Sequence, residues 1–435
     1  MALTRRYFLK SAGLSLFGVG FVPSFMRRTA FALEQPQASA RKKILVAIFQ
    51  RGAADGLNIV VPYGEKDYYS MRPTIAIPAP KGGLAGSSAG AQAAIDLDGF
   101  FGFHPSLAGL KPLYDARHLA VIHAAGSPST SRSHFDAQDY MESGAPDAKS
   151  ANDGWLNRYL QDQPEADATP FRAVAFAPRM PRTLQGAAPA LAMEDLRGFK
   201  LRPVPRAPQG NGHAPTSSLD QIVDSMYASS SDPLLSSTAR EMFGAVSTLQ
   251  HIGVDNYKAD NGVEYPPGPL SRSLQQVAQL IKSGVGLEVA FAEVGGWDNH
   301  VNEGGVEGQL AARLREFGDA LAAFHQDMGD RMADICVLTM TEFGRTAREN
   351  GNRGTDHGHA NVMFALGGPV KGGKVYGEWP GLRPEQLNEG RDLALTTDFR
   401  DVFAEVLVRH LGTRNASDIF PGFAVSPQRF RGFLG

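Results

Sequence analysis

The chain has 435 residues, with 43 Lys and Arg against 45 Asp and Glu, and 43% of its residues are hydrophobic. This composition is typical of a soluble globular protein and excludes the disordered and fibrous classes. The formal net charge of −2 provides no basic field for a phosphate backbone, so we predict no nucleic-acid partner. The one cysteine, Cys336, cannot form an internal disulfide and is predicted to be a small buried hydrophobe.

The first residues of the chain are typical of an export signal. Residues 4–10 (TRRYFLK) show a twin-arginine pattern, and the weakly apolar residues 11–22 that follow are too few to cross a hydrocarbon core of about 30 Å. An A-x-A processing pattern (AFA) ends at residue 32. We therefore predict that residues 1–32 are a signal peptide handled by the twin-arginine translocase. Residues 33–435 would then form one exported domain, periplasmic or extracellular, without a transmembrane anchor.

Apolar runs and amphipathic helices alternate along the rest of the chain. The first run, residues 43–50 (KILVAIFQ), predicts a strand buried on both faces, as in parallel sheets. Further strands are predicted at residues 119–124, 172–177, 286–293, 334–340 and 362–366. Helices are predicted at residues 104–117, 218–229, 234–251, 270–282, 310–328 and 399–411, and a short helix is predicted to begin at Ser133. Residues 202–217, rich in Pro and Gly, are predicted to be a surface loop. The alternation predicts an α/β fold with a mostly parallel central sheet flanked by helices on both sides.

Polar residues follow the ends of the best predicted strands, or precede the last one. They are Asp55, Asn58, Asp298, His300, Glu342, Arg345, Asp356, His357 and His359. Open α/β sheets bind ligands beyond the carboxyl ends of their strands, so we expect these side chains to meet at one edge. Carboxylates and imidazoles brought together repel one another, or lose their hydration on burial without compensation, unless a cation neutralises them. This pattern indicates a divalent metal site. Mixed nitrogen and oxygen ligands favour zinc or manganese, with calcium or magnesium as alternatives.

Some of these residues also have purely structural interpretations. Asp55 precedes Gly56, and Asp298 comes shortly after Gly295 and Gly296, so each could close a turn, and Glu342 could pair with Arg345 across a loop. The remaining histidines considered are predicted to be structural, either hydrogen-bonded in the core or placed near a helix end; they are His104, His123 and His410.

Ser133 begins a predicted helix and has two compatible interpretations. A serine at this position caps the helix, which contributes about 1 kcal/mol. The same hydroxyl faces the positive end of the helix dipole, which favours an alkoxide, and a neighbouring metal would make it a nucleophile. Ser131 is the alternative nucleophile.

Five segments of the chain resemble a known family. They are FQRGAADGLN from Phe49, SRSHFDAQDYMESG from Ser131, GGWDNHVNEGG from Gly295, TEFGRT from Thr341 and GTDHGHAN from Gly354. They are similar to the exported bacterial proteins grouped as domain-of-unknown-function family 1501, within the alkaline phosphatase and sulfatase-like superfamily. The resemblance implies an alkaline phosphatase-like α/β fold, a dinuclear metal site and a hydroxyl nucleophile that hydrolyses phosphate or sulfate esters.

The resemblance also implies roles for individual residues. The metal ligands would be Asp55, Asp298, His300, Asp356, His357 and His359. Ser133 or Ser131 would be the nucleophile, while Arg345 or Arg132 would hold the anionic oxygens of a small ester substrate. Two departures stand out: a single residue separates Asp298 from His300, where the superfamily usually has three, and the modified-cysteine motif of sulfatases is absent from the sequence. The alternative hypothesis is a non-catalytic, metal-stabilised binding or assembly protein that contacts a component of the cell envelope.

Overall fold

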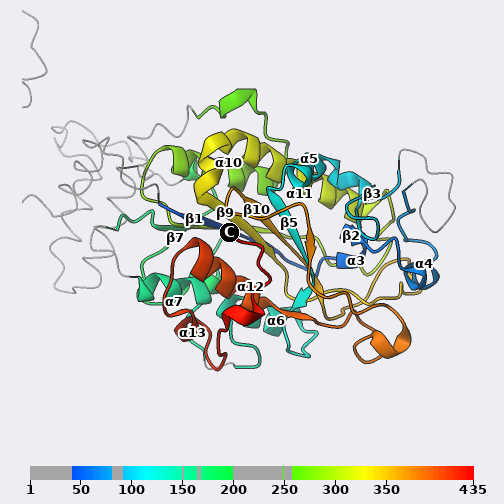
Figure 1. Cartoon of the computed structure of the whole chain (residues 1–435). Coiled ribbons are helices and arrows are strands. Elements are labelled where there is room, and N and C mark those ends of the chain that lie inside the picture. The colour runs from blue at the N-terminus through cyan, green and yellow to red at the C-terminus, as the bar shows by residue number, and fades with distance from the viewer. Residues whose placement is uncertain (1–41, 81–91, 149–150, 164–167, 199–247, 249–256) are drawn as a thin grey trace, which may run out of the picture.

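The structure is a computed structural model that describes residues 42–435 apart from 81–91, 149–150, 164–167, 199–247 and 249–256 (Figure 1). The predicted signal peptide, the predicted loop at 202–217 and the predicted helix at 218–229 lie outside the described residues. So does the predicted helix at 234–251, except for residue 248.

A nine-stranded sheet forms the centre of the molecule, in the order β11-β5-β10-β9-β1-β8-β6-β7, with β12 also paired to β5. Its strands are β1 (Ile44–Gln50), β5 (Leu119–Gly126), β6 (Ala173–Phe176), β7 (Leu191–Met193), β8 (Val289–Val294), β9 (Ile335–Met340), β10 (Asn361–Gly367), β11 (Val375–Tyr376) and β12 (Thr397–Asp398). All neighbouring pairs are parallel except those of β10, which runs antiparallel to β5 and β9. The predicted mostly parallel sheet is confirmed, and the start of β10 lies at the edge where the other long strands end. A small antiparallel sheet contains β2 (Val60–Val61), β4 (Gly102–Phe103) and β3 (Ile95–Asp96).

The sheet is buried on both faces, as the apolar run of β1 predicts. Val46 and Ile48 belong to one core cluster, whereas Leu45 and Phe49 belong to the other. Alternate side chains of a strand point to opposite faces, so a strand without polar positions must be covered twice. Cys336 lies fully buried in the second cluster, where burial raises the pKa of its thiol to about 12. Its predicted role as a buried hydrophobe is confirmed.

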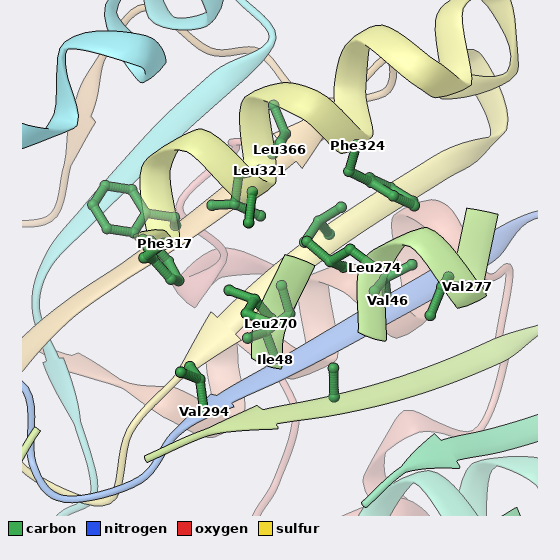
Figure 2. Close-up of a cluster of buried hydrophobic side chains, with 14 of the residues drawn as sticks. Val46, Ile48, Leu270, Leu274, Val277, Val294, Phe317, Leu321, Phe324 and Leu366 are labelled. Atoms are coloured by element: carbon green, nitrogen blue, oxygen red, sulfur yellow. The ribbon is translucent and has the colours of Figure 1, made fainter. Parts of the chain in front are cut away.

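Helices cover each face of the sheet (Figure 1). On one side lie α10 (Pro269–Lys282), α11 (Gln309–Met328) and α5 (Lys111–Asp115), and on the other α6 (His134–Ser143), α7 (Trp155–Asp162), α12 (Phe399–Glu405) and α13 (Ala416–Ile419). Figure 2 shows Phe317, Leu321 and Phe324 of α11 over the strands, beside Leu270 and Leu274 of α10. The apolar stripe predicted along residues 310–328 therefore packs on the sheet as expected.

Two predicted helices differ from the structure. The helix predicted at 104–117 is a 3-10 helix at Pro105–Leu110 followed by α5, because Leu107 has non-helical angles and Pro112 lacks the N–H that a continuous helix needs. The helix predicted at 399–411 changes from α12 to a π-helix at Val406–His410. The remaining short elements are α3 (Gly56–Ile59), α4 (Lys66–Met71) and the 3-10 helices Arg182–Leu184, Leu196–Gly198, Asp260–Gly262, Gly329–Asp334, Pro384–Gln386 and Pro427–Arg429. None of the helices in the described ranges combines the length and apolar character needed to cross a membrane.

Candidate metal centre

Three loops meet at the edge where the parallel strands end. His134 begins α6 after β5, Asp298 and His300 follow β8, and His357 precedes β10. The His357 loop is held in place by backbone pairing to the loop after β9, through a bridge between Arg345 and His357. Because β10 is antiparallel, its preceding loop reaches the same edge as the loops that follow the other strands.

Glycine at two positions allows the loop around His357 to approach the backbone of Arg345 and of His300 closely. A Cβ on Gly358 would lie 2.3 Å from the backbone carbonyl carbon of Arg345, and one on Gly354 would lie 2.4 Å from the backbone oxygen of His300. Real Cβ atoms do not approach backbone so closely, so the loop around His357 can pack here only with glycine on both sides.

Four side chains, which we call the imidazole group, converge at this edge: His134, Asp298, His300 and His357. One ligand atom from each of His134, Asp298 and His357 lies within 4.8 Å of the others. The Nε2 atom of His300 lies 2.9 Å from Nε2 of His357 and 3.0 Å from Oδ1 of Asp298. The predicted residues Asp298, His300 and His357 are thus brought together.

The outer ring nitrogen of each imidazole faces a group that can only accept a hydrogen bond. Nδ1 of His134 lies 2.8 Å from Oε1 of Glu342, and Nδ1 of His357 lies 2.8 Å from the carbonyl of Arg132. Nδ1 of His300 lies 3.2 Å from Oδ1 of Asp356. Each Nδ1 is therefore placed to donate, and a ring in that neutral tautomer would turn the lone pair of Nε2 toward the centre of the group.

Lone pairs arranged in this way repel one another unless a cation lies between them. In that tautomer the Nε2 atoms of His300 and His357, which are at hydrogen-bond distance, would have no hydrogen to share. Nε2 of His134 is buried without a hydrogen-bond partner and lies 3.5 Å from Oδ2 of Asp298, an acceptor. Burial lowers the pKa of His357, which disfavours an additional proton there. Imidazole nitrogens and one carboxylate fit zinc or manganese better than calcium or magnesium.

Arg345 orients the carboxylate of this group. Its guanidinium is completely buried, and Nη2 donates to Oδ1 of Asp298 at 2.6 Å. Burial acts in the opposite direction, but this hydrogen bond and charge lower the pKa of Asp298 overall. Arg345 also donates to the backbone carbonyls of Gly52, Ala53, Trp297 and Thr355, and its Nη1 lies 3.5 Å from Nε2 of His300. The prediction that Arg345 holds substrate oxygens does not suit this geometry, because its donors are engaged within the chain.

Glu342 holds His134 of the imidazole group in place. It is fully buried, and its Oε1 accepts from His134, from Nε2 of Gln138 at 2.8 Å and from the backbone of Gly52 at 2.9 Å. Although burial opposes the effect, the bonds from His134 and Gln138 lower the pKa of Glu342, while the bond to Glu342 raises the pKa of His134. The alternative pairing of Glu342 with Arg345 is not what the structure shows: these side chains bond to His134 and Asp298.

Asp55, predicted as a metal ligand, belongs to a different cluster. Both of its oxygens accept from the guanidinium of Arg72, and both side chains are buried. Arg72 also donates to Oδ1 of Asn58 at 2.9 Å and to the carbonyls of Thr346 and Ala347. The positive charge that the sequence analysis assigned to a metal is supplied for Asp55 by the chain itself. We call Asp55, Asn58, Arg72 and Glu303 the arginine cluster.

Glu303 completes the arginine cluster. Burial and the neighbouring carboxylate of Asp55 raise its pKa well above the ordinary value, and its Oε2 accepts from the hydroxyl of Thr355 at 2.7 Å. The raised pKa favours a neutral Glu303, which leaves the positive charge of Arg72 to the carboxylate of Asp55.

The other predicted site residues surround the imidazole group without joining it. Asp356 accepts from His300 and from Asn350. The side chain of His359 is absent from the group, and burial lowers its pKa. The guanidinium of Arg132 bonds to Glu389 at 2.7 Å and Asp392 at 2.8 Å.

The two candidate serines lie at the start of α6. The hydroxyl of Ser133 accepts from the backbone N–H of Asp136 at 3.5 Å, so the predicted helix cap is present. The hydroxyl of Ser131 accepts from the backbone N–H of Ser133 at 3.3 Å. Ser133 directly precedes His134, which places a hydroxyl-bearing residue next in the chain to a member of the imidazole group.

Sequence reasoning missed His134, and it assigned the structural histidines correctly. His104, His123 and His410 are buried, and their rings lie at hydrogen-bond distance from backbone carbonyls. His134 was recognised only as part of a helix start. It begins the helix that follows β5, and a position just beyond a strand is the same signal that identified Asp298 and His300, so that signal was sufficient to find it.

Fold and site together define an α/β protein that gathers a histidine-rich candidate metal centre at the carboxyl edge of a mostly parallel sheet. The chain belongs to the family described as protein of unknown function (DUF1501), whose model matches residues 42–419. Among solved structures it is similar to the crystal structure of PsFucS1 sulfatase from Pseudoalteromonas sp., at 11% sequence identity and a TM-score of 0.36, over 91% of this chain and 73% of that chain. A likeness at that score carries no argument about function. No curated protein matches the chain.

Proposed function

We propose that this protein is an exported, metal-dependent hydrolase of phosphate or sulfate esters. The observation that carries the proposal is the imidazole group, in which His134, His300 and His357 bring their Nε2 atoms close to one another and to Asp298. A zinc or manganese ion bound there would act as a Lewis acid on an ester oxygen and would attract the anionic group of the substrate. One ion suits the geometry better than two, because Arg72 already neutralises Asp55.

The start of α6 supplies the proposed nucleophile. Ser133 Oγ attacks phosphorus or sulfur and forms an ester with the protein as the substrate alcohol leaves; water then releases the anion. The N-terminal N–H groups of α6 offset negative charge on the attacking oxygen and on the anion. Ser131, whose hydroxyl lies in the same turn, is the alternative nucleophile.

The experiment is hydrolysis of aryl phosphates and aryl sulfates by the purified protein, with zinc or manganese added after removal of all metal by a chelator. We expect turnover that depends on the metal and is lost in Ser133→Ala, with Ser131→Ala as the matched variant from the same turn. Both serine variants should keep the bound metal. Turnover that survives in both would contradict the covalent mechanism, and a protein that binds no divalent metal would contradict the proposal as a whole.

The geometry of the arginines favours a second candidate function, a non-catalytic, metal-stabilised binding or assembly protein of the cell envelope. Arg345 is completely buried with its donors engaged, and Arg132 pairs with two carboxylates, so neither guanidinium is available to an ester in this arrangement. This candidate predicts one bound metal per chain and no hydrolysis of any aryl ester.

A further inference from the structure

Two apolar side chains stand out on the surface of the described residues. Phe135 is 89% exposed and Val301 is 50% exposed, and no other large hydrophobic residue in the described ranges counts as exposed. Each directly follows a histidine of the imidazole group, since Phe135 comes after His134 and Val301 after His300. A single exposed apolar residue needs no explanation, but both of these flank one polar site.

The fold brings these positions together from distant parts of the chain. Phe135 lies in the first turn of α6, and Val301 lies in the loop after β8. The rings of His134 and His300 both pack against the ring of His357, with centroid separations of 4.4 Å and 4.7 Å. Phe135 and Val301 are therefore the chain neighbours of two histidines that contact the same imidazole. We call Phe135 and Val301 the apolar lip.

The backbone beneath the apolar lip is anchored. The carbonyl of Val301 accepts from Nε2 of Gln309 at 2.9 Å, and the helix of Phe135 is capped by Ser133. The ring of His134 is in turn packed against Phe343, at a centroid separation of 5.1 Å. A ligand that covers the apolar lip would thus bind a prepared surface, and the removal of apolar area from water would contribute to its affinity.

We propose that the apolar lip selects esters whose leaving group is aromatic, with the anionic end of the ligand at the imidazole group and the aromatic ring against Phe135 and Val301. This inference rests on the proposed function for the anionic end of the ligand and extends it to the substrate class. Aromatic rings suit Phe135 because offset or edge-to-face contacts add to the effect of burial.

The test is the binding of two phosphonates to the zinc-loaded protein, measured by calorimetry. Phenylphosphonate and methylphosphonate carry the same anionic group and have no ester bond to break, so binding is measured without turnover. We expect phenylphosphonate to bind roughly tenfold more tightly. Phe135→Ser should reduce this preference to roughly threefold, and the double variant with Val301→Ser should abolish it.

The controls separate this inference from the proposed function. Phe135→Leu should keep part of the preference, and no lip variant should change zinc content or methylphosphonate affinity, because neither side chain supplies a ligand atom. Equal affinity for the two phosphonates in the unaltered protein, or a preference that survives in the double variant, would contradict the proposed role of the apolar lip. Neither result would contradict anion binding at the imidazole group. Failure of both phosphonates to bind would contradict anion binding at the imidazole group and the proposed role of the apolar lip together.

Discussion

The imidazole group and the arginine cluster lie at the same edge of the sheet, yet they balance charge in different ways. In the arginine cluster the carboxylate of Asp55 faces the guanidinium of Arg72, which has a partner for each of its donating nitrogens. In the imidazole group the lone pairs of His134, His300 and His357 face one another. Polar residues at a strand edge therefore indicate an external cation where more acceptors converge than the cations of the chain satisfy; here Arg345 pairs with Asp298 but leaves Nε2 of His134 without a partner.

Loss of the internal cation should have the largest effect on stability. Arg72→Met leaves Asp55 buried without a counter-charge, so we expect the free energy of unfolding to fall by about 3–5 kcal/mol. Urea denaturation measures this change. The double variant Arg72→Met with Asp55→Asn should recover part of the loss, and the folded single variant should still bind metal. A variant that loses its metal at unchanged stability would show that the two clusters are not independent.

Loss of a candidate ligand should act on metal binding and leave folding largely unchanged. His357→Ala removes one nitrogen of the imidazole group, and we expect zinc affinity to fall by more than about a hundredfold. Elemental analysis after dialysis against a weak chelator gives the metal content. His359→Ala is the matched control, because it alters a histidine of the same loop whose ring lies outside the group. Equal metal content in the two variants would contradict the candidate metal centre.

A smaller effect is expected for a residue that contacts a candidate ligand and not the proposed ion itself. Glu342→Gln keeps an oxygen near Nδ1 of His134 but removes the negative charge that makes the ring a better ligand. We expect zinc affinity to fall about 10- to 100-fold, as for other supporting carboxylates. A competition titration with a zinc-binding dye measures the change. Glu293→Gln serves as the control, since Glu293 pairs with Arg51 outside the imidazole group.

The smallest effect concerns the pH dependence of the arginine cluster. Burial and Asp55 raise the pKa of Glu303 above its ordinary 4.5. The contribution of protonated Glu303 to the free energy of unfolding is therefore fully present below pH 4.5 and is lost as the pH rises through the raised pKa. Glu303→Gln cannot ionise and still bonds to Thr355. We expect it to be more stable than the unaltered protein by about 1 kcal/mol at neutral pH, with the difference disappearing near pH 4. Urea titrations at several pH values measure this, and parallel pH profiles for the two proteins would contradict a neutral Glu303.

Much of the fold follows from local sequence patterns. The apolar run of β1, the spaced stripe of α11 and the serine cap of α6 depend on residues close together in the chain, so periodicity and capping chemistry predict them. The position of Asp298 and His300 at this edge was predictable for a related reason, because the carboxyl ends of parallel strands share one edge, whereas His357 reaches that edge only because β10 is antiparallel. The breaks at Leu107 and after Glu405 were not predicted, although Pro112 lies in the first of these segments and lacks the N–H that a continuous helix needs.

The sequence by itself determined the layers of this protein, the edge at which its polar residues meet and the loop that carries His357. Only the tertiary structure decided the pairing of charges: Asp55 belongs to Arg72, Glu342 belongs to His134, and His134 joins the imidazole group while His359 does not. It also decided that β10 runs antiparallel, without which His357 would lie at the opposite edge. The physical reason is that hydrophobic periodicity is local, whereas the partner of a buried charge is whichever opposite charge the completed fold places beside it.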